Sequence, residues 1–389
     1  MNKQIVTLIG LGLTPSTGGP SKTISLFKDA LNANVVSFTD FNVLKKEGSS
    51  IPNTEHIEID SYFFGKYFYW SRKKNTICAE KIVSSSDLIS CHIIWRYSSF
   101  WTYYLSNKYS IPYWVVLHGS LDPYVFTYRG LIKKIWFKFF GRKFLKNASK
   151  VICSTSYELD RVKSVYTGEN LVQIYWPIQK IDMSQKTSIK TSLKLELGID
   201  LNDRVLIFIG RFHYIKRPLE TIQAFISSKV NNVTLIMVGP YESYQHEELI
   251  SYIQKNNGNK NNIKIVGPAY GAHKDNLIIL SDALISMSLK ENYGHVVAES
   301  ISAGNPVILS PGNALAHDLK AIDCGWMLND NSISSASKAI KEFSDATSEE
   351  ISKMGNKGKI WANKNLSPQI FDEKINNLAY DSLNFTNAD

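Results

Sequence analysis

Short apolar runs alternate with longer stretches of mixed polarity along almost the whole chain. This alternation is typical of buried parallel strands that are each followed by a helix. In the first half the pattern predicts strands at Ile5–Gly10, Val35–Phe38, His92–Trp95, Tyr113–His118 and Lys150–Ser154. In the second half it predicts strands at Val205–Gly210, Thr234–Val238, Ile263–Val266, Ala283–Ser286 and Pro306–Leu309. The sequence therefore predicts an α/β protein.

A polar, lysine-rich stretch without a strand pattern, residues 179–200, separates the two series of strands and is interpreted as a linker. We expect two Rossmann-like domains facing across a cleft, one formed by residues 1–178 and the other by residues 201–365. The final segment, residues 366–389, is expected to be helical and to pack back on the first domain. Ligands of such sheets bind beyond the carboxyl ends of the strands, so chemistry is expected in the loops that follow them.

Composition narrows the class of protein. The chain has 389 residues, 44% of them hydrophobic and 20% charged, as in folded proteins, and its net charge of +9 makes polyanions plausible partners. Its four cysteines are widely separated and contain no CxxC pair, which favours a cytoplasmic protein without a zinc or disulfide framework. No apolar run reaches the ~20 residues needed to cross a bilayer, so the chain is expected not to span a membrane but could lie on one.

Two acidic residues flank the start of a predicted helix in the segment ENYGHVVAE, residues 291–299. Glu291 lies in the loop after a predicted strand, and Glu299 lies in the first turns of the helix. Carboxylates accept hydrogen bonds from sugar hydroxyls, whereas the helix amino terminus favours a phosphate. A polyhydroxylated phosphate ester would suit this segment, although Glu299 could equally be a solvated helix residue.

A second cluster, GRFHYIK at residues 210–216, follows the first strand of the second half. Gly210 allows the backbone to turn sharply and to approach a ligand. Arg211 and Lys216 supply a forked donor and a point charge, a combination that suits a diphosphate. Two solvated basic residues in a loop are the alternative interpretation.

Along the chain, GRFHYIK comes first, followed by Val238-Gly239-Pro240 after the next strand, then ENYGHVVAE, then Ala303-Gly304-Asn305-Pro306. This order resembles the GT-B glycosyltransferases, and within them the retaining glycosyltransferase family 4. The resemblance covers nearly the whole chain and is densest from Val205 to Gly325. It implies that Arg211 and Lys216 bind the donor diphosphate, that Glu291 contacts the transferred sugar, and that Glu299 holds the ribose. Backbone donors are implied at Tyr293, Gly294, His295 and Val296, and contacts to the base near Gly239, Pro240 and Pro268.

The first half fits the same resemblance. The glycine-rich loop after the first strand contains Gly18 and Gly19, which match the family's glycine pair near donor phosphate and acceptor. His118 matches the family's histidine beside the transferred sugar, and Asp122 is a further candidate on the acceptor side. The family often has Pro-Asn-Gly where this chain has Pro177-Ile-Gln, a difference that puts the contact there in doubt. A dinucleotide-binding loop at Gly10 lacks its third glycine, so a dehydrogenase is disfavoured.

Residues 129–146, RGLIKKIWFKFFGRKFLK, are basic and aromatic and contain no acidic residue. Lys134, Lys138 and Arg142 recur at steps of four and would share one helix side, while Trp136 is one of the interleaved aromatic residues. We predict an amphipathic helix on an anionic membrane surface. An ordinary surface helix is the alternative, and nucleic acid is disfavoured because no recognition motif accompanies the segment.

The resemblance implies a retaining transfer of a hexose from a nucleoside diphosphate sugar, with UDP favoured because it is prevalent among related sequences. The implied acceptor is a glycan or lipid-linked saccharide, in polysaccharide or glycolipid biosynthesis, and the transfer is expected to be metal-independent. No DxD-type carboxylate pair follows a strand, so neither a metal nor another cofactor is expected. Two rivals remain open: a sugar-nucleotide epimerase of the same architecture and a non-catalytic nucleotide-sugar-binding protein.

Overall fold

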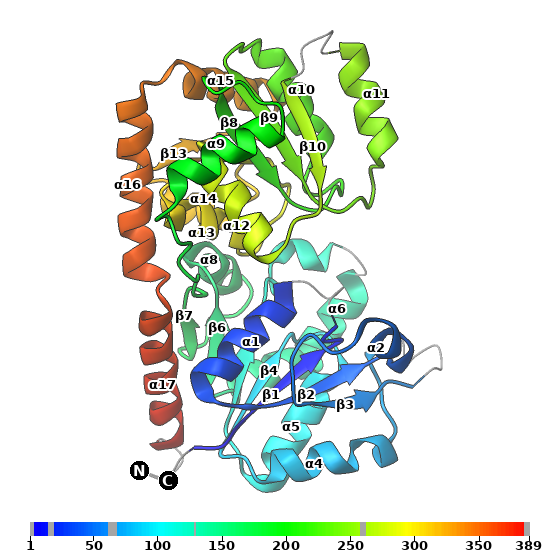
Figure 1. Cartoon of the computed structure of the whole chain (residues 1–389). Coiled ribbons are helices and arrows are strands. Elements are labelled where there is room, and N and C mark those ends of the chain that lie inside the picture. Colours follow the sequence, from blue (N-terminus) through cyan, green and yellow to red (C-terminus); the bar gives the residue numbers. More distant parts are fainter. Residues whose placement is uncertain (1–3, 15–18, 61–67, 128–129, 257–261, 385–389) are drawn as a thin grey trace. The chain divides into compact units, whose positions relative to one another are not determined.

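A computed structural model describes residues 4–14, 19–60, 68–127, 130–256 and 262–384 (Figure 1). The chain divides into two compact units: Met1–Pro177 with Pro368–Asp389, and Ile178–Ser367. The four cysteines lie within the described residues and are all free thiols.

Within its described residues, the first unit contains a seven-stranded sheet in the order β3-β2-β1-β4-β5-β6-β7, and every neighbouring pair is parallel. The strands are β1 (Val6–Leu11), β2 (Asn34–Thr39), β3 (Thr54–Glu58), β4 (Leu88–His92), β5 (Tyr113–Val116), β6 (Lys150–Cys153) and β7 (Leu171–Gln173). Its helices include α1 (Gly19–Leu31), α2 (Phe41–Glu47), α4 (Ile77–Ser84), α5 (Tyr97–Tyr109), α6 (Gly130–Trp136), α7 (Arg142–Lys146), α8 (Ser156–Lys163) and α17 (Pro368–Asn384).

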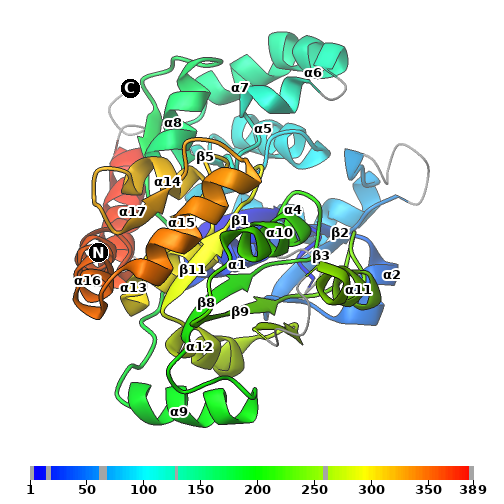
Figure 2. The same cartoon turned by 90° about the horizontal axis from the view of Figure 1, so that it is seen from above.

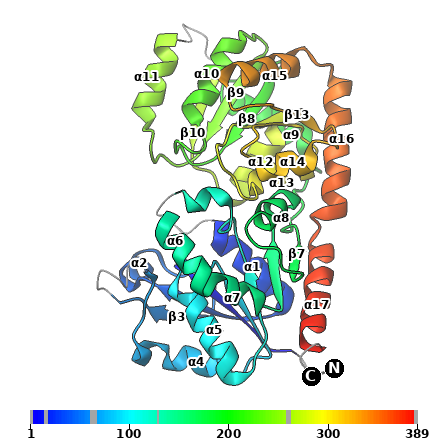
Figure 3. The same cartoon turned by 180° about the vertical axis from the view of Figure 1, so that it is seen from behind.

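Helices cover both faces of this sheet. Figure 1 shows α1 on one side of β1 and β4, and Figure 3 shows α5 and α7 on the other. Phe27 of α1 and Phe371 of α17 make an edge contact, with ring centroids 5.3 Å apart, so the closing helix packs within the first unit. The α5 side is filled by an apolar cluster that includes Trp101, Leu105 and Phe144.

The second unit contains, within its described residues, a six-stranded parallel sheet in the order β10-β9-β8-β11-β12-β13. Its strands are β8 (Arg204–Ile209), β9 (Val233–Val238), β10 (Ile263–Gly267), β11 (Ala283–Ser286), β12 (Val307–Leu309) and β13 (Gly325–Met327). Its helices are α9 (Lys186–Glu196), α10 (Pro218–Ser228), α11 (His246–Asn256), α12 (Gly271–Leu280), α13 (His295–Ala303), α14 (Ala314–Leu319), α15 (Ile333–Asp345) and α16 (Ser348–Asn365). Figure 2 shows α10 and α15 on one side of β8 and α12 on the other.

The sequence pattern did not predict three of the observed strands: β3, β7 and β13. All three lie at a sheet edge and their residues are mostly half-buried, so they lack a continuous apolar run. The strand predicted at His92–Trp95 was also misplaced, because β4 ends at His92. Ile93 has a left-handed backbone, φ 78°, which an extended strand does not allow.

The linker predicted at residues 179–200 is wrong in extent and in structure. The structure assigns these residues to the second unit, where α9 packs on α12. Its Lys194 is buried, and the ammonium donates to the carbonyls of Leu201 and Asp203, at 2.8 and 2.6 Å. The helix is anchored mainly by polar contacts, which an apolar pattern cannot reveal.

Candidate active site

The loop between β8 and α10 carries the two predicted phosphate ligands. It begins where the Gly210 N–H donates to the carbonyl of Val238, at 2.9 Å, and it ends at Arg217, whose φ of 59° turns the chain into Pro218, the first residue of α10. The Lys216 N–H donates back to the carbonyl of His213, at 2.8 Å. This internal bond holds the loop as a compact turn.

Lys216 and Glu291 form an ion pair. Both side chains are about four-fifths buried, and burial together with the positive charge of Arg211 lowers the pKa of Lys216 to about 8. The ion pair favours the ammonium form against these two effects. The structure thus brings Glu291 to the loop of Lys216 and Arg211, which lie 75 and 80 positions earlier in the sequence.

Arg211 lies at the exposed rim of this cluster. One of its terminal nitrogens donates to both carboxylate oxygens of Glu242, at 2.7 and 3.0 Å, and more than half of the Arg211 side chain is accessible. Such an exposed pair is worth little and exchanges readily. Arg211 can therefore exchange Glu242 for an anion that it binds more strongly.

The Glu291 loop is held by a second loop after β12. The Glu291 N–H donates to the carbonyl of Gly312, at 2.8 Å, and the Ala314 N–H donates to the Glu291 carbonyl, at 3.1 Å. A Cβ at Gly312 would lie 2.1 Å from the carbonyl oxygen of Ser288, so only glycine permits this approach. The backbone of Glu291 is therefore held by the loop that follows β12.

Asn313 ties the ends of β11 and β12 together and was missed by the sequence analysis. Its side-chain nitrogen donates to the Ser286 carbonyl at 2.9 Å, and its oxygen accepts from the Ser286 hydroxyl at 3.0 Å. The side chain is 1% exposed. A lone asparagine two residues after Pro311 carries no signal of this role in the sequence.

Helix α13 begins at His295 and follows Gly294, whose φ of 80° is left-handed. No side chain caps this helix at Gly294, so the first turn, with His295 and Val296, presents a helix amino terminus suited to an anion. A Cβ at Gly294 would lie 3.3 Å from Cγ of Glu291, which places this helix amino terminus beside the Glu291 side chain. Tyr293 is buried, and its ring meets that of His295 edge-on, with centroids 5.1 Å apart.

Glu299 is 6% exposed and forms an ion pair with Lys274 of α12, at 2.8 Å. A buried carboxylate requires such compensation, and Lys274 supplies it from a different helix. The alternative of a solvated Glu299 is therefore wrong. Lys274 was not among the predicted residues, because nothing in a lysine near a helix start indicates its partner.

The loops after β9 and β10 lie next to the β8 loop. The Pro240 carbonyl accepts from the Phe212 N–H, at 2.8 Å, and the Gly239 N–H donates to Gly267, at 2.9 Å. A Cβ at Gly239 would lie only 1.8 Å from the Gly210 carbonyl oxygen, so this position requires glycine. Pro268 is exposed just after β10. The three predicted base-side residues thus occupy carboxyl ends of neighbouring strands.

In the first unit His118 follows β5 with a left-handed backbone, φ 51°. Its Nε2 lies 2.9 Å from Nδ1 of the buried His92, and the two rings stack with centroids 5.2 Å apart. Burial lowers the pKa of His118 to about 4, and burial with the adjacent His118 lowers the pKa of His92 well below its usual value. A neutral pair results, in which one ring donates and the other accepts.

Glu158 holds the turn that presents His118. Its buried carboxylate accepts from the Gly119 N–H, at 2.5 Å, and from the N–H and hydroxyl of Ser154, both at 2.6 Å. These bonds join the ends of β5 and β6. Neither Glu158 nor His92 was predicted, because Glu158 meets Gly119, and His92 meets His118, only through the fold.

The remaining predicted residues of the first unit have mixed outcomes. Gly19 is the exposed first residue of α1, whereas Gly18 lies outside the described residues. Asp122 accepts from the Tyr124 N–H at 2.8 Å and forms a two-pronged ion pair with Arg161, both contacts 3.3 Å. Asp122 thus has a local structural role.

The basic aromatic segment is helical from Gly130 to Lys146 but is interrupted by a π-helical turn, Phe137–Gly141. Trp136 is half-buried, because its ring packs on Trp95 and Phe140, with centroids 4.8 and 5.2 Å away. Four other apolar side chains are at least half exposed: Leu131, Ile132, Ile135 and Phe139. We call them the apolar ridge.

Three cations of this segment, Lys134, Lys138 and Arg142, are exposed and line one cavity of about 480 Å³. Phe126 and Phe137 line it with them. The predicted alignment of these three cations on one side is therefore consistent with their shared cavity. No helix in the described residues is both long and apolar enough to cross a membrane.

These features define a class of protein. Residues 190–361 match the family profile of Glycosyl transferases group 1, and the two parallel α/β units form the GT-B fold. The predicted resemblance is confirmed for the second unit, and the comparisons support a glycosyltransferase.

Individual relatives share parts of the sequence or the whole fold. An uncharacterised glycosyltransferase of Methanocaldococcus jannaschii is 24% identical over 177 residues, and N-acetyl-alpha-D-glucosaminyl L-malate synthase of Bacillus anthracis is 28% identical over 139 residues. These alignments span 45% and 35% of this chain and 43% and 35% of the relatives. The Anabaena protein Alr3699/HepE, crystallised in complex with UDP, matches 97% of this chain and all of its own with a TM-score of 0.77 at 17% identity.

Proposed function

We propose that this chain is a retaining, family 4-type glycosyltransferase that moves a hexose from a nucleoside diphosphate sugar to a glycan or lipid-linked saccharide, in polysaccharide or glycolipid biosynthesis. The observation that carries the proposal is the contact between Lys216 and Glu291 beside the start of α13. It joins a cation for the diphosphate, a carboxylate for sugar hydroxyls and a helix amino terminus for a phosphate.

Each group has a defined role in the proposed reaction. The bond between the anomeric carbon and the diphosphate oxygen breaks, and the acceptor oxygen bonds to the same face of that carbon. The acceptor proton passes to the departing phosphate oxygen. Lys216, Arg211 and the α13 amino terminus stabilise the charge that develops on the diphosphate. Glu291 holds the sugar, Glu299 holds the ribose, and His118 contributes on the sugar side.

This charge stabilisation needs no metal, because the chain itself supplies two cations and a helix dipole. Among the described residues, no group of three or more His, Cys, Asp or Glu side chains gathers as metal ligands would. We expect transfer rates to be unchanged by EDTA, measured against a reaction supplemented with Mg²⁺. A loss of rate that Mg²⁺ restores would contradict metal independence.

A uridine donor is favoured because the Anabaena neighbour has been crystallised with UDP and also with UDP-glucose. Thermal shift against a panel of UDP-, GDP- and ADP-sugars tests this choice, since a ligand that binds the folded state raises its melting temperature. A larger shift with GDP- or ADP-sugars would reassign the base.

The decisive experiment measures nucleoside diphosphate release with and without a lipid-linked saccharide acceptor. Acceptor-dependent release, lost in Glu291→Gln and Lys216→Ala but kept in the exposed-site controls Glu247→Gln and Lys255→Ala, supports the transferase. Near-normal rates in both site variants would refute the proposed site. Acceptor-independent release, or donor binding without turnover, would instead indicate the epimerase or the binding protein.

We further propose that the apolar ridge and its cations rest on an anionic membrane surface of the cytoplasmic face. Four exposed apolar side chains beside Lys134, Lys138 and Arg142 suit the boundary between headgroups and acyl chains. Replacing Ile135 and Phe139 by serine should reduce co-sedimentation with vesicles containing anionic lipid. Equal binding by the double variant, or equal binding to neutral vesicles, would contradict this contact.

A further inference from the structure

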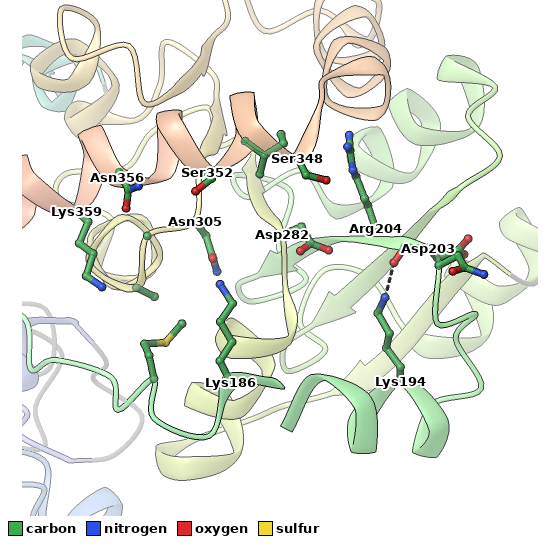
Figure 4. A pocket seen from close by; sticks show the side chains of 15 residues that line it. Lys186, Lys194, Asp203, Arg204, Asp282, Asn305, Ser348, Ser352, Asn356 and Lys359 are labelled. Atoms are coloured by element: carbon green, nitrogen blue, oxygen red, sulfur yellow. Dashed lines mark hydrogen bonds between the residues drawn. The ribbon is translucent and has the colours of Figure 1, made fainter. Parts of the chain in front are cut away.

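A second polar cavity, of about 610 Å³, lies in the second unit, away from the loops described above (Figure 4). It is lined by Arg204 at the start of β8, by Asp282 just before β11 and by Gly304 at the end of α13. These positions mark the amino ends of the strands, whereas Gly210 and Glu291 follow their carboxyl ends. A six-residue strand is about 20 Å long, so the two regions lie at opposite edges of one sheet.

Some charged side chains of this cavity are occupied by the protein itself. Lys194 donates to the two carbonyls already described, and Nη1 of Arg204 donates to the carbonyls of Phe343 and Ser344, at 2.7 and 3.1 Å. The Asp203 carboxylate accepts from the Thr234 hydroxyl, at 2.8 Å. Lys194, Arg204 and Asp203 thus line the cavity and hold the ends of the strands in place.

The acidic Asp282, which also lines the cavity, is compensated as well. Asp282 pairs with Lys190 of α9, at 2.5 Å, and accepts from the Val205 N–H, at 2.8 Å. One carboxylate is thus shared between a cation and a backbone donor. Its only direct ion pair among the described residues is with Lys190, although its charge also raises the pKa of Lys186.

Two lysines of this cavity, the partly buried Lys186 and the exposed Lys359, have no direct ion pair among the residues that the structure describes. Within the described part of the chain, neither Lys186 nor Lys359 has a carboxylate within ion-pair distance. Figure 4 shows Lys186 extending from α9 and Lys359 from α16 toward the same space, with Asn305 beside it. Burial and the charge of Lys190 lower the pKa of Lys186, Asp282 raises it, and Lys359 lowers it further.

We propose that this cavity binds a small phosphorylated polyol, with Lys186 and Lys359 as the ligands of its phosphate. Two ammonium groups that line one cavity suit a doubly charged phosphate monoester, since each supplies up to three donors. The neutral lining is largely polar, with Ser348, Ser352 and Asn356 on α16 available for hydroxyl groups. A cavity of this size falls within the range of small-ligand sites.

This site is independent of the donor site and of the reaction proposed there. Glucose 6-phosphate serves as the probe, with inorganic phosphate and glucose as its separate halves, and binding is measured by titration calorimetry with the donor site saturated by UDP. We expect one equivalent of glucose 6-phosphate to bind more tightly than either half. Binding should weaken with added salt, because screening reduces the attraction between the ions.

The variants Lys186→Gln and Lys359→Gln should each weaken this binding about tenfold or more, whereas Lys353→Gln, an exposed position of α16 outside the cavity, should not. Without ligand, neither cavity variant should lower the melting temperature, because each removes a charge repulsion. A purely structural role would lower it.

Three results would overturn the proposal: no binding of glucose 6-phosphate, binding unaffected by both cavity variants, or binding abolished by UDP. Inorganic phosphate binding as tightly as the ester would also overturn it, because the polyol would then contribute nothing. If UDP itself fails to bind, the donor-site proposal fails, while the response to Lys186→Gln still decides this one.

Discussion

The activity of this protein should fall as the pH rises above 8, because Lys216 then loses the charge that binds the donor diphosphate. The pKa of Lys216 is lowered to about 8 by burial and by the nearby Arg211. About nine-tenths of the free protein therefore carries an ammonium group at pH 7, and about one-tenth at pH 9. The sign is fixed: the charged form binds, and it is the form lost on raising the pH.

The expected size of the fall in activity follows from these two fractions. If only the ammonium form binds the donor, kcat/KM for the donor falls about tenfold between pH 7 and pH 9, since kcat/KM reports the free enzyme. The value of kcat at saturating donor should change little, because the bound diphosphate raises the lysine pKa. Initial rates over a range of donor concentrations at half-unit steps of pH provide both quantities.

Lys216→Arg is the matched control. An arginine stays charged over the whole range, so the fall above pH 8 should disappear even if the variant is slower overall. A wild-type kcat/KM that stays level from pH 7 to pH 9 would refute this reasoning. The same fall in Lys216→Arg would assign the titration to another group.

Three further predictions test individual contacts. Gly239→Ala should lower the free energy of unfolding by about 2–4 kcal/mol and weaken UDP binding, because its Cβ would overlap a carbonyl oxygen 1.8 Å away. The control Gly130→Ala, whose Cβ would have no atom within 4 Å, should change neither quantity. Urea unfolding measures the first and calorimetry the second. Lys274→Met should raise the donor KM and lower stability by about 2–4 kcal/mol by leaving Glu299 unpaired, and adding Glu299→Gln should restore stability but not KM. Burial lowers the pKa of His118 from 6.5 to about 4, so the unfolded state binds more protons than the folded state between these pH values. The free energy of unfolding should therefore drop as the pH falls from 6.5 to 4, and should drop less in His118→Gln. Equal pH dependence of the two proteins in urea unfolding would contradict this.

Local sequence was sufficient for much of the architecture. Ten strands followed from apolar runs, nine of them near their actual positions, and the α/β class followed from their alternation with helices. The strand-end loops carrying Arg211, Lys216 and Glu291 were found because, in a parallel sheet, every strand end lies at the same edge. Each of these inferences uses residues that are close together in the chain.

The partners of those residues were decided by tertiary structure alone. Lys274, Asn313 and His92 hold or accompany predicted residues, yet each is an ordinary residue in its own segment, and only packing brings it to its partner. The inward turn of Trp136 likewise follows from its contact with Trp95, from another strand–helix unit. Sequence determines which chemistry each strand end can supply, whereas the fold determines which of these groups meet, because their contacts join residues that no local pattern relates.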